Sequence, residues 1–506
     1  MSEFLGRCYG ETTPNKVSFI SKQTPAVGEY VYLEYEDKIV LGMIDALFRG
    51  STTLGDDLLN PDTIGKILKF DGDSECYIRG TITILGDKDK LIIPRTPAPP
   101  GTIVYKADEK LLKEIFEKGD GLRIGTILKQ PDVAVKLDVN KMVSRHLAIL
   151  AMTGSGKSNT TSIIIDELLR LNGTIVVFDV HSEYSQTEFK NGDVRIIPAK
   201  INPRDLSIHE YLKLGKFSEN ATNQTKYLRD AYNYAKELDT TDSKDSFFDN
   251  MINWINSKIV ELENEEKKNN SHIEANYQVL FKLEDMKRIH NKLLDSTDVE
   301  DMVDSIVPGK LNVVSLGSLS ETATDIIVNH MLNNILFRRK NKIDNNDNQK
   351  VLDYPVFCII EEAHNLASHD RNTKSKYTIS KIAREGRKFG VGLCLVSQSP
   401  KALDSATLSQ INNLIILRLV EPGDQKHVQK SSESLSNDLL EQLPSLNIGE
   451  AVILGQMTKI PTMVKIDEFK GKSVGNDLDI VKLWQADKIK REEKRKKNEE
   501  EIELLL

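Results

Sequence analysis

The chain has few cysteines and no long apolar run, and both features limit the kinds of protein that it can be. Its 506 residues include four cysteines, Cys8, Cys76, Cys358 and Cys394, whose spacing fits neither a zinc site nor a redox pair. No apolar stretch approaches the roughly 20 residues that a transmembrane helix needs. The N-terminus has an early acid and lacks the apolar segment of a signal peptide. We therefore expect a cytoplasmic protein with free thiols and no membrane partner.

An excess of positive charge is also missing. Lys and Arg total 68 against 76 Asp and Glu, which gives a net charge of −8 at pH 7. Any contact with nucleic acid must then come from a local basic surface. Charged residues make up 28% and apolar residues 39% of a chain too long for one core, so we expect a soluble protein of two or three globular domains.

The most informative segment is a Gly-rich turn between a predicted strand and a predicted helix. The apolar residues 148–151 precede the turn, and an amphipathic helical pattern follows it over 160–169. In a P-loop, such a turn and the helix N-terminus bind phosphates, the following Lys reaches the β- and γ-phosphates, and the Ser hydroxyl binds Mg²⁺. The P-loop pattern has Gly at its first position and this chain has Ala151, which only shapes the entry to the turn. The predicted nucleotide-binding residues are Thr153, Gly154, Ser155, Gly156, Lys157, Ser158 and Asn159.

Two further apolar strands end in polar residues that suit a nucleotide hydrolase. Residues 356–360 run directly into Glu361 and Glu362. In P-loop motors the first acid steadies Mg²⁺ through a water molecule and the second activates the attacking water. We therefore predict that Glu361 and Ser158 hold the metal ion and that Glu362 is the general base. Gln398 follows the strand 391–397 and is predicted to sense the γ-phosphate, although an ordinary strand exit is the alternative.

Cationic residues cluster between these two strands. Arg384 and Arg387 are three residues apart and share one helical face. They are candidate arginine fingers, which often come from a neighbouring subunit, or else a surface salt-bridge pair. Arg371, Lys374 and Lys376 are the best candidates for contact with a phosphodiester backbone, with a solvated loop as the alternative.

The distribution of patterns predicts several regions. Short β segments, including a hairpin over 30–44 and a strand near 90–93, suggest a small barrel, whereas alternating strands and helices from 141 predict a parallel α/β sheet. No strand pattern occurs between about 205 and 305. The predicted regions are an N-terminal β-barrel (1–100), a linker with a short helix (101–140), the ATPase core in two parts (141–204 and 310–470), an all-α insertion (205–309) and a charged helical tail (471–506).

Four segments together resemble the FtsK–HerA superfamily of P-loop motors, and most closely its archaeal HerA branch. They begin at His146, Phe178, Ile360 and Arg384, and the last includes Arg384-Glu-Gly-Arg-Lys-Phe-Gly. The resemblance covers nearly the whole chain. It implies a RecA-like core and a homohexameric ring that uses ATP to translocate double-stranded DNA. It also implies a partner, the NurA nuclease, in the resection of DNA ends for recombinational repair.

Some assignments stay open at this stage. Asp179, His181 and Glu183 follow a predicted strand at the ligand-binding edge of the sheet, without individual roles. A conjugation- or secretion-type motor of the same superfamily is an alternative, which the lack of a membrane segment disfavours. A nucleotide-dependent scaffold is a second alternative, which the paired acids disfavour.

Overall fold

The computed structural model describes most of the chain. The described residues are 3–54, 58–71, 76–117, 119–218, 220–238, 246–267, 269–291, 293–294, 301–346, 348–432 and 435–472, with six isolated positions from 482 to 491. Most of the predicted charged tail (471–506) therefore lies outside the described residues.

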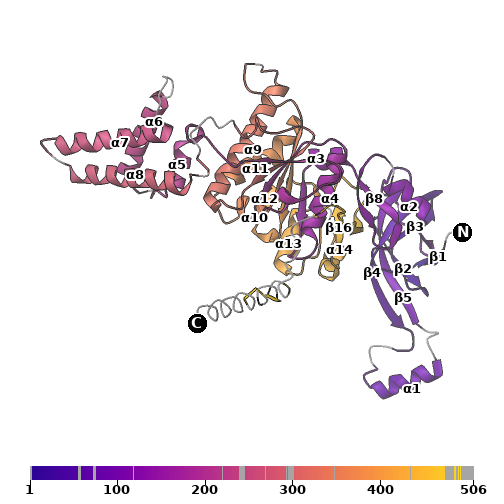
Figure 1. The fold of residues 1–506 in the computed structure, drawn as a ribbon. Coiled ribbons are helices and arrows are strands. Elements are labelled where there is room, and N and C mark those ends of the chain that lie inside the picture. The colour runs from indigo at the N-terminus through magenta and orange to yellow at the C-terminus, as the bar shows by residue number, and fades with distance from the viewer. Residues whose placement is uncertain are drawn as a thin grey trace, which may run out of the picture.

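The N-terminal region forms a closed six-stranded barrel, which confirms the predicted fold of this part. Its strands are β1 (Phe4–Cys8), β2 (Lys16–Ser21), β3 (Tyr30–Tyr35), β4 (Lys38–Ser51), β5 (Cys76–Asp87) and β6 (Ile103–Lys106). They pair in the order β1-β2-β5-β4-β3-β6. The predicted hairpin is β3–β4, whose two turn residues, Glu36 and Asp37, have positive φ angles of 51° and 56°, as a tight hairpin turn requires. Beyond the barrel, β4 and β5 continue as an arm that bears α1 (Pro61–Asp71) at its tip (Figure 1).

The strand predicted near 90–93 is wrong. The Asp87 carboxylate accepts hydrogen bonds from the amides of Asp89, Lys90 and Ile92, and these bonds fold the segment into a turn. The barrel is closed instead by β6, which follows the proline-rich segment 94–101.

An 11-stranded sheet forms the centre of the molecule. Its further strands are β7 (Leu122–Ile127), β8 (Gln130–Leu137), β9 (Leu147–Leu150), β10 (Ile175–Asp179), β11 (Val194–Ile197), β12 (Leu311–Ser315), β13 (Val356–Ile360), β14 (Val391–Ser397), β15 (Asn413–Ile416), β16 (Glu450–Leu454) and β17 (Thr462–Ile466). Their order is β11-β12-β10-β13-β14-β9-β15-β16-β17-β7-β8, and the first seven are parallel. Apart from the edge strand β11, the parallel strands are almost continuously apolar and buried, because both faces are covered.

Helices cover the two faces of this sheet. Those that contact its strands are α2 (Glu109–Phe116), α3 (Val139–Ser144), α4 (Lys157–Arg170), α9 (Glu321–Ile343), α10 (Ala363–Leu366) and α11 (Lys374–Phe389). Three shorter helices of this region are α12 (Ser405–Leu408), α13 (Pro422–Ser431) and α14 (Asn437–Gln442), and α14 contacts the barrel strand β4. Helix α4 connects β9 to β10, α9 connects β12 to β13, and α11 connects β13 to β14. In the strand order of the sheet, the step through α4 runs in one direction and the steps through α9 and α11 run in the other. Because parallel crossovers are right-handed, α9 and α11 pack together on one face and α4 lies on the other.

Sequence analysis did not identify the hairpin β7–β8, which lies in the segment predicted as linker. It pairs with β17 through Gly125, Thr126 and Ile127 and extends the core sheet toward the barrel. Polar and apolar residues alternate in both strands. The α/β region was predicted from strands that alternate with helices, and no such helix pattern accompanies this hairpin.

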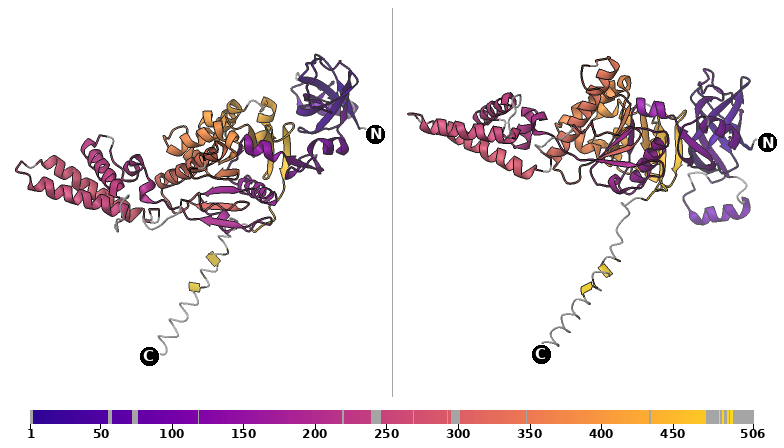
Figure 2. Two further views of the ribbon diagram at one scale, coloured as in Figure 1. Left: turned by 90° about the horizontal axis from the view of Figure 1, so that it is seen from above. Right: turned by 45° about the horizontal axis from the view of Figure 1, so that its top comes forward.

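The predicted helical insertion is confirmed as helices α5 (Ile208–Leu214), α6 (Thr222–Leu238), α7 (Phe247–Asn264) and α8 (Asn270–Ile289). Helices α6, α7 and α8 lie side by side and project from the core at the end opposite the barrel (Figures 1 and 2). Aromatic contacts among Tyr211, Tyr232, Phe247 and Phe248 join α5 to this bundle. In the described part of the chain, no helix is long and apolar enough to cross a membrane.

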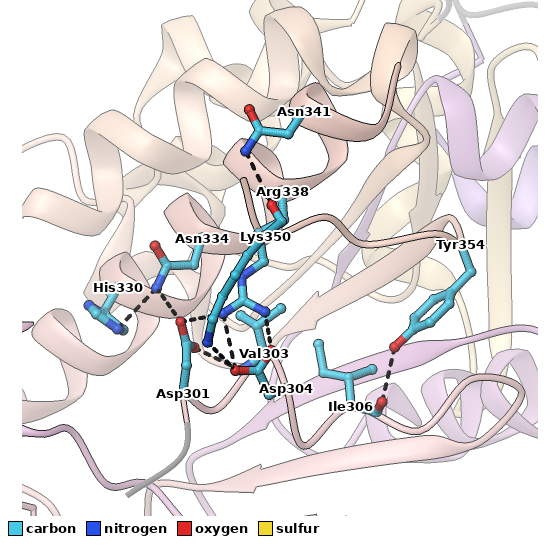
Figure 3. Close-up of polar contacts among 10 residues, drawn as sticks. All are labelled: Asp301, Val303, Asp304, Ile306, His330, Asn334, Arg338, Asn341, Lys350 and Tyr354. Atoms are coloured by element: carbon cyan, nitrogen blue, oxygen red, sulfur yellow. Dashed lines mark hydrogen bonds and ion pairs between the residues drawn. The ribbon is translucent and has the colours of Figure 1, made fainter. Parts of the chain in front are cut away.

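A buried arginine anchors the chain where it returns from the insertion to the sheet. Arg338 of α9 is 4% exposed and pairs with Asp301 at 2.7 Å and with Asp304 (Figure 3). Lys350 also pairs with Asp304 at 2.7 Å, and the Asn334 amide donates to Asp301. These contacts fix the segment before β12 against α9, so the chain returns from the insertion to the core at a defined place.

Candidate active site

The P-loop lies at the carboxyl end of β9, between the sheet and α4. Gly154 and Gly156 have φ angles of 76° and 106°, a region that residues with side chains rarely adopt. Their amides donate no hydrogen bond within the described residues, and the first amides of α4 have no intrahelical acceptor. This arrangement forms a concave surface of donors that suits a phosphate chain.

The other loop residues shape this surface. The Ser155 hydroxyl donates to the Met152 carbonyl at 2.6 Å, and the Ser155 carbonyl accepts from the Gly449 amide at 3.1 Å. The Thr153 hydroxyl donates to the Gln398 side chain at 2.6 Å. Gln398, at the end of the neighbouring strand β14, is therefore brought against the P-loop, where the predicted sensor role would place it.

Glu362 lies at the centre of the polar side chains of the site. Lys157 donates to its Oε1, and the Gln398 amide donates to the same oxygen at 2.7 Å. Nδ1 of His364 lies 3.3 Å from its Oε2, and Nε2 of His181 lies 3.7 Å from its Oε1. Burial opposes ionisation of Glu362, but the contacts with Lys157, His364 and Gln398 together outweigh it and lower the pKa of this carboxyl.

The backbone of Glu362 is strained, with a φ angle of 45° in a residue that has a side chain. Strain of this kind persists where surrounding contacts hold a side chain in place. Here they hold a carboxylate next to the P-loop lysine, where a general base is needed.

Glu361 differs from its neighbour because it faces the interior. It is 1% exposed, and burial together with the nearby Glu183 raises its pKa to about 8. The Tyr184 hydroxyl donates to its Oε1 at 2.9 Å. Its Oε2 is buried and has no hydrogen-bond partner in the part of the chain that the structure describes.

These residues fit a divalent cation. An orphaned carboxylate oxygen and the Ser158 hydroxyl are hard oxygen donors, which Mg²⁺ prefers. When bound, Mg²⁺ would neutralise charge on the β- and γ-phosphates, and Ser158 and Glu361 would hold it, Glu361 through water.

Asn159 makes a contact that its place in the P-loop did not predict. Its Nδ2 donates to the Asp467 carbonyl and its Oδ1 accepts from the Phe469 amide, both at 2.9 Å. The segment 467–472 after β17 thus crosses the start of α4, and Phe469 packs on Phe189 with ring centroids 5.4 Å apart. The Asn159 side chain therefore faces this segment, and the predicted nucleotide contact of Asn159 would use its backbone amide.

Arg384 and Arg387 lie far from the P-loop of their own chain. α11 starts at the carboxyl edge of β13 and ends at the amino edge of β14, and Gly386 lies against the ring of His146, before β9. Both arginines are exposed, and neither makes an ion pair within the described ranges. The structure does not bring them together with Lys157 and Glu362 in one chain.

The three predicted DNA-binding cations are held by acids of this chain. Arg371 pairs with Glu321 at 2.8 Å, Lys374 lies 3.7 Å from Glu210, and Lys376 lies 3.2 Å from Asp404. Lys374 and Lys376 belong to the first turn of α11 rather than to a loop. A DNA phosphate would have to compete with these carboxylates.

Sequence analysis missed two side chains of the site, Tyr184 and His364. Tyr184 ends the motif Asp179-Val-His-Ser-Glu-Tyr. Spacing alone does not show that a tyrosine five residues after the end of β10 turns back to the sheet and reaches Glu361. His364 follows Glu362 by two residues and reaches it because α10 begins there.

Comparison with known proteins agrees with this geometry. The sequence profile of the family described as "Helicase HerA, central domain" matches residues 122–335, and that of the HAS barrel domain matches residues 5–88. A probable helicase of Methanocaldococcus jannaschii is 43% identical over 501 residues, which is 97% of this chain and 96% of that protein. The DNA double-strand break repair helicase HerA of Sulfolobus acidocaldarius is 40% identical over 490 residues, covering 96% and 97%. The HerA protein of Pyrococcus furiosus is 32% identical over 545 residues, covering 97% and 98%.

The fold and the site define an ATPase of the RecA-like P-loop class, with the phosphate-binding turn after β9 and the paired acids after β13, two parallel strands separated by β14. Within that class, the chain belongs to the HerA helicase family. The predicted fold and the resemblance are both confirmed, and the chain is an ATP-dependent helicase of that family.

Proposed function

We propose that this protein is a ring-forming, ATP-dependent translocase of double-stranded DNA that acts with a NurA-type nuclease in the resection of DNA ends for recombinational repair. The observation that supports it best is the cluster of Lys157, Glu362 and Gln398 beside a P-loop, in a chain whose relatives are named DNA double-strand break repair helicases.

In this proposal ATP binds with its phosphates on residues 153–159, and Lys157 leaves Glu362 for the β- and γ-phosphates. The carboxylate of Glu362 is then free to accept a proton from the attacking water, and Gln398 contacts the γ-phosphate. Before ATP binds, the contact with Lys157, together with His364 and Gln398, lowers the pKa of Glu362 against the effect of burial, so the carboxylate is already ionised when the lysine moves to the phosphates.

The position of the arginines supports the proposal of a ring. Each chain holds one P-loop, and Arg384 and Arg387 face away from it at the opposite edge of the sheet. A ring, which we propose to be a homohexamer, would place the exposed arginines of one chain at the nucleotide of the next.

DNA contact is proposed for Arg371, Lys374 and Lys376. These cations lie where α11 follows the acidic strand end, so a movement on ATP turnover could reach them. The partner nuclease and the cytoplasmic location are proposed from the family alone.

The test is the rate of ATP hydrolysis with and without blunt duplex DNA, in the presence of Mg²⁺. The proposal expects stimulation by duplex DNA in the parent protein and none in Glu362→Gln. A rate that is independent of DNA but dependent on an added protein substrate would favour the secretion-type motor instead.

A further inference from the structure

We propose that Tyr184 is a positioning residue, which holds Glu361 through its hydroxyl so that the free carboxylate oxygen faces the cation bound with the nucleotide. The inference rests on the proposed function and assigns a role to the motif 179–184, which sequence analysis left open.

The first support is the fit of the tyrosine. Tyr184 is 1% exposed, and its hydroxyl donates to Oε1 of Glu361 at 2.9 Å. A carboxylate with one oxygen fixed in this way cannot turn freely about its last bond, so its second oxygen keeps one direction. That second oxygen, Oε2, is the buried atom without a partner within the described residues.

The second support is the turn that presents Tyr184. The fully buried Asp179 carboxylate, at the end of β10, accepts from the amides of Glu183, Tyr184 and Ser185 at 3.1, 3.0 and 3.4 Å. Ser182 takes a positive φ angle of 60° to make the turn. Asp179 therefore stabilises the backbone of this turn, and the turn directs the Tyr184 side chain toward the end of β13.

The third support is a link to the P-loop helix. The hydroxyl of Tyr184 lies near the hydroxyl of Thr161, whose proton is donated to the Lys157 carbonyl at 3.1 Å. The Tyr184 hydroxyl thus lies between the first turn of α4, which bears Ser158, and the strand end that bears Glu361. This geometry sets the relative position of the two predicted metal-side residues.

The test uses Tyr184→Phe in the full-length protein, because this change keeps the buried ring and removes only the hydroxyl. The readout is binding of a fluorescent, non-hydrolysable ATP analogue as Mg²⁺ is titrated. We expect the half-saturating Mg²⁺ concentration to rise roughly tenfold, since a hydrogen bond to a charged group is lost. The affinity measured without Mg²⁺ should not change.

Tyr211→Phe is the matched control. Tyr211 is also fully buried, and its hydroxyl donates to the Pro203 carbonyl at 2.9 Å, away from the site. This variant should leave the Mg²⁺ titration unchanged. In a Glu361→Gln background, Tyr184→Phe should add little, because the side chain that it positions has already been altered.

An unchanged Mg²⁺ titration in folded Tyr184→Phe would overturn the inference, as would an equal shift in Tyr211→Phe. If Tyr184→Phe does not fold, Thr161→Val must raise the half-saturating Mg²⁺ concentration, and an unchanged value there also counts against the inference. A parent protein whose nucleotide binding ignores Mg²⁺ would instead contradict the proposed function itself.

Discussion

Glu362 and Lys157 contact each other directly in the structure, so their roles must be separated by experiment. Lys157→Ala removes the cation expected on the phosphates, and nucleotide affinity should fall together with hydrolysis. Glu362→Gln keeps a side chain of the same shape and removes only the base, so ATP should still bind while turnover falls by roughly 10²- to 10⁴-fold. Equilibrium binding of an ATP analogue and steady-state hydrolysis check both variants. Parental turnover in Glu362→Gln would show that another group activates the water.

A second residue-scale prediction concerns Asp45 in the barrel. Asp45 is 2% exposed, its Oδ2 accepts from Thr83, and its Oδ1 has no partner among the described residues. Burial raises its pKa from 3.8 to about 6, against the hydrogen bond from Thr83. Between these two values the folded state holds more protons than the unfolded state, so the free energy of unfolding falls as pH rises through this window and then levels off.

Asp45→Asn removes this dependence. The stability of the variant relative to the parent should therefore increase by about 2 kcal/mol between pH 4 and pH 7. Thermal unfolding of both proteins across this range checks the sign. Parallel profiles would mean that Asp45 does not titrate differently in the folded and unfolded states.

At this scale the sequence predicted residue types better than their contacts. The loop residues, the acid pair and Gln398 were all predicted from motifs, because each motif combines a strand end with a definite chemistry, and the structure places them close together. Tyr184 and His364 escaped prediction because they reach the site through a turn and a short helix whose directions depend on Asp179 and on the strained backbone of Glu362.

Among the secondary structure elements, α11 bears two sets of predicted functional cations, one at each end. Its first turn includes Lys374 and Lys376, beside Arg371, and the acids that pair with them are Glu210, Asp404 and Glu321. Replacing the three cations with Ala should weaken binding to duplexes of any sequence to the same degree, because phosphate contacts are independent of sequence.

The same triple variant should also lower the slope of log affinity against log salt by roughly 0.9 for each lost contact. Basal ATP hydrolysis should survive, whereas its stimulation by DNA should be lost. Fluorescence anisotropy of labelled duplexes at several salt concentrations measures the slope. Unchanged binding and stimulation would place the DNA contact on another part of the chain.

Elements with strong periodicity were predictable, and those defined by tertiary pairing were not. The parallel strands other than β11, and α4, α7 and α8, follow from continuous apolar runs and amphipathic spacing. The hairpin β7–β8 joins the sheet through β17, which lies more than 300 residues away in the chain. The segment 90–93 has the apolar composition of a strand, but local hydrogen bonds to Asp87 hold it as a turn.

For the whole molecule, the account requires that catalytic sites are shared between chains. A double variant, Arg384→Ala with Arg387→Ala, should bind ATP and assemble but not hydrolyse it, and Lys157→Ala should also be inactive. Mixed rings of the two should recover part of the parental turnover, because some interfaces then combine an intact P-loop with intact arginines. Absence of recovery in mixed rings, with a monomeric mass in solution, would contradict the shared site.

The central claim is that ATP hydrolysis at this site moves the protein along duplex DNA. Displacement of a third strand from a triplex measures that movement directly, without requiring the duplex to be unwound or cut. The account predicts that the parent protein releases the third strand in ATP with Mg²⁺. It predicts no release with a non-hydrolysable analogue or with Glu362→Gln. Vigorous DNA-stimulated hydrolysis with no release of the third strand would contradict it.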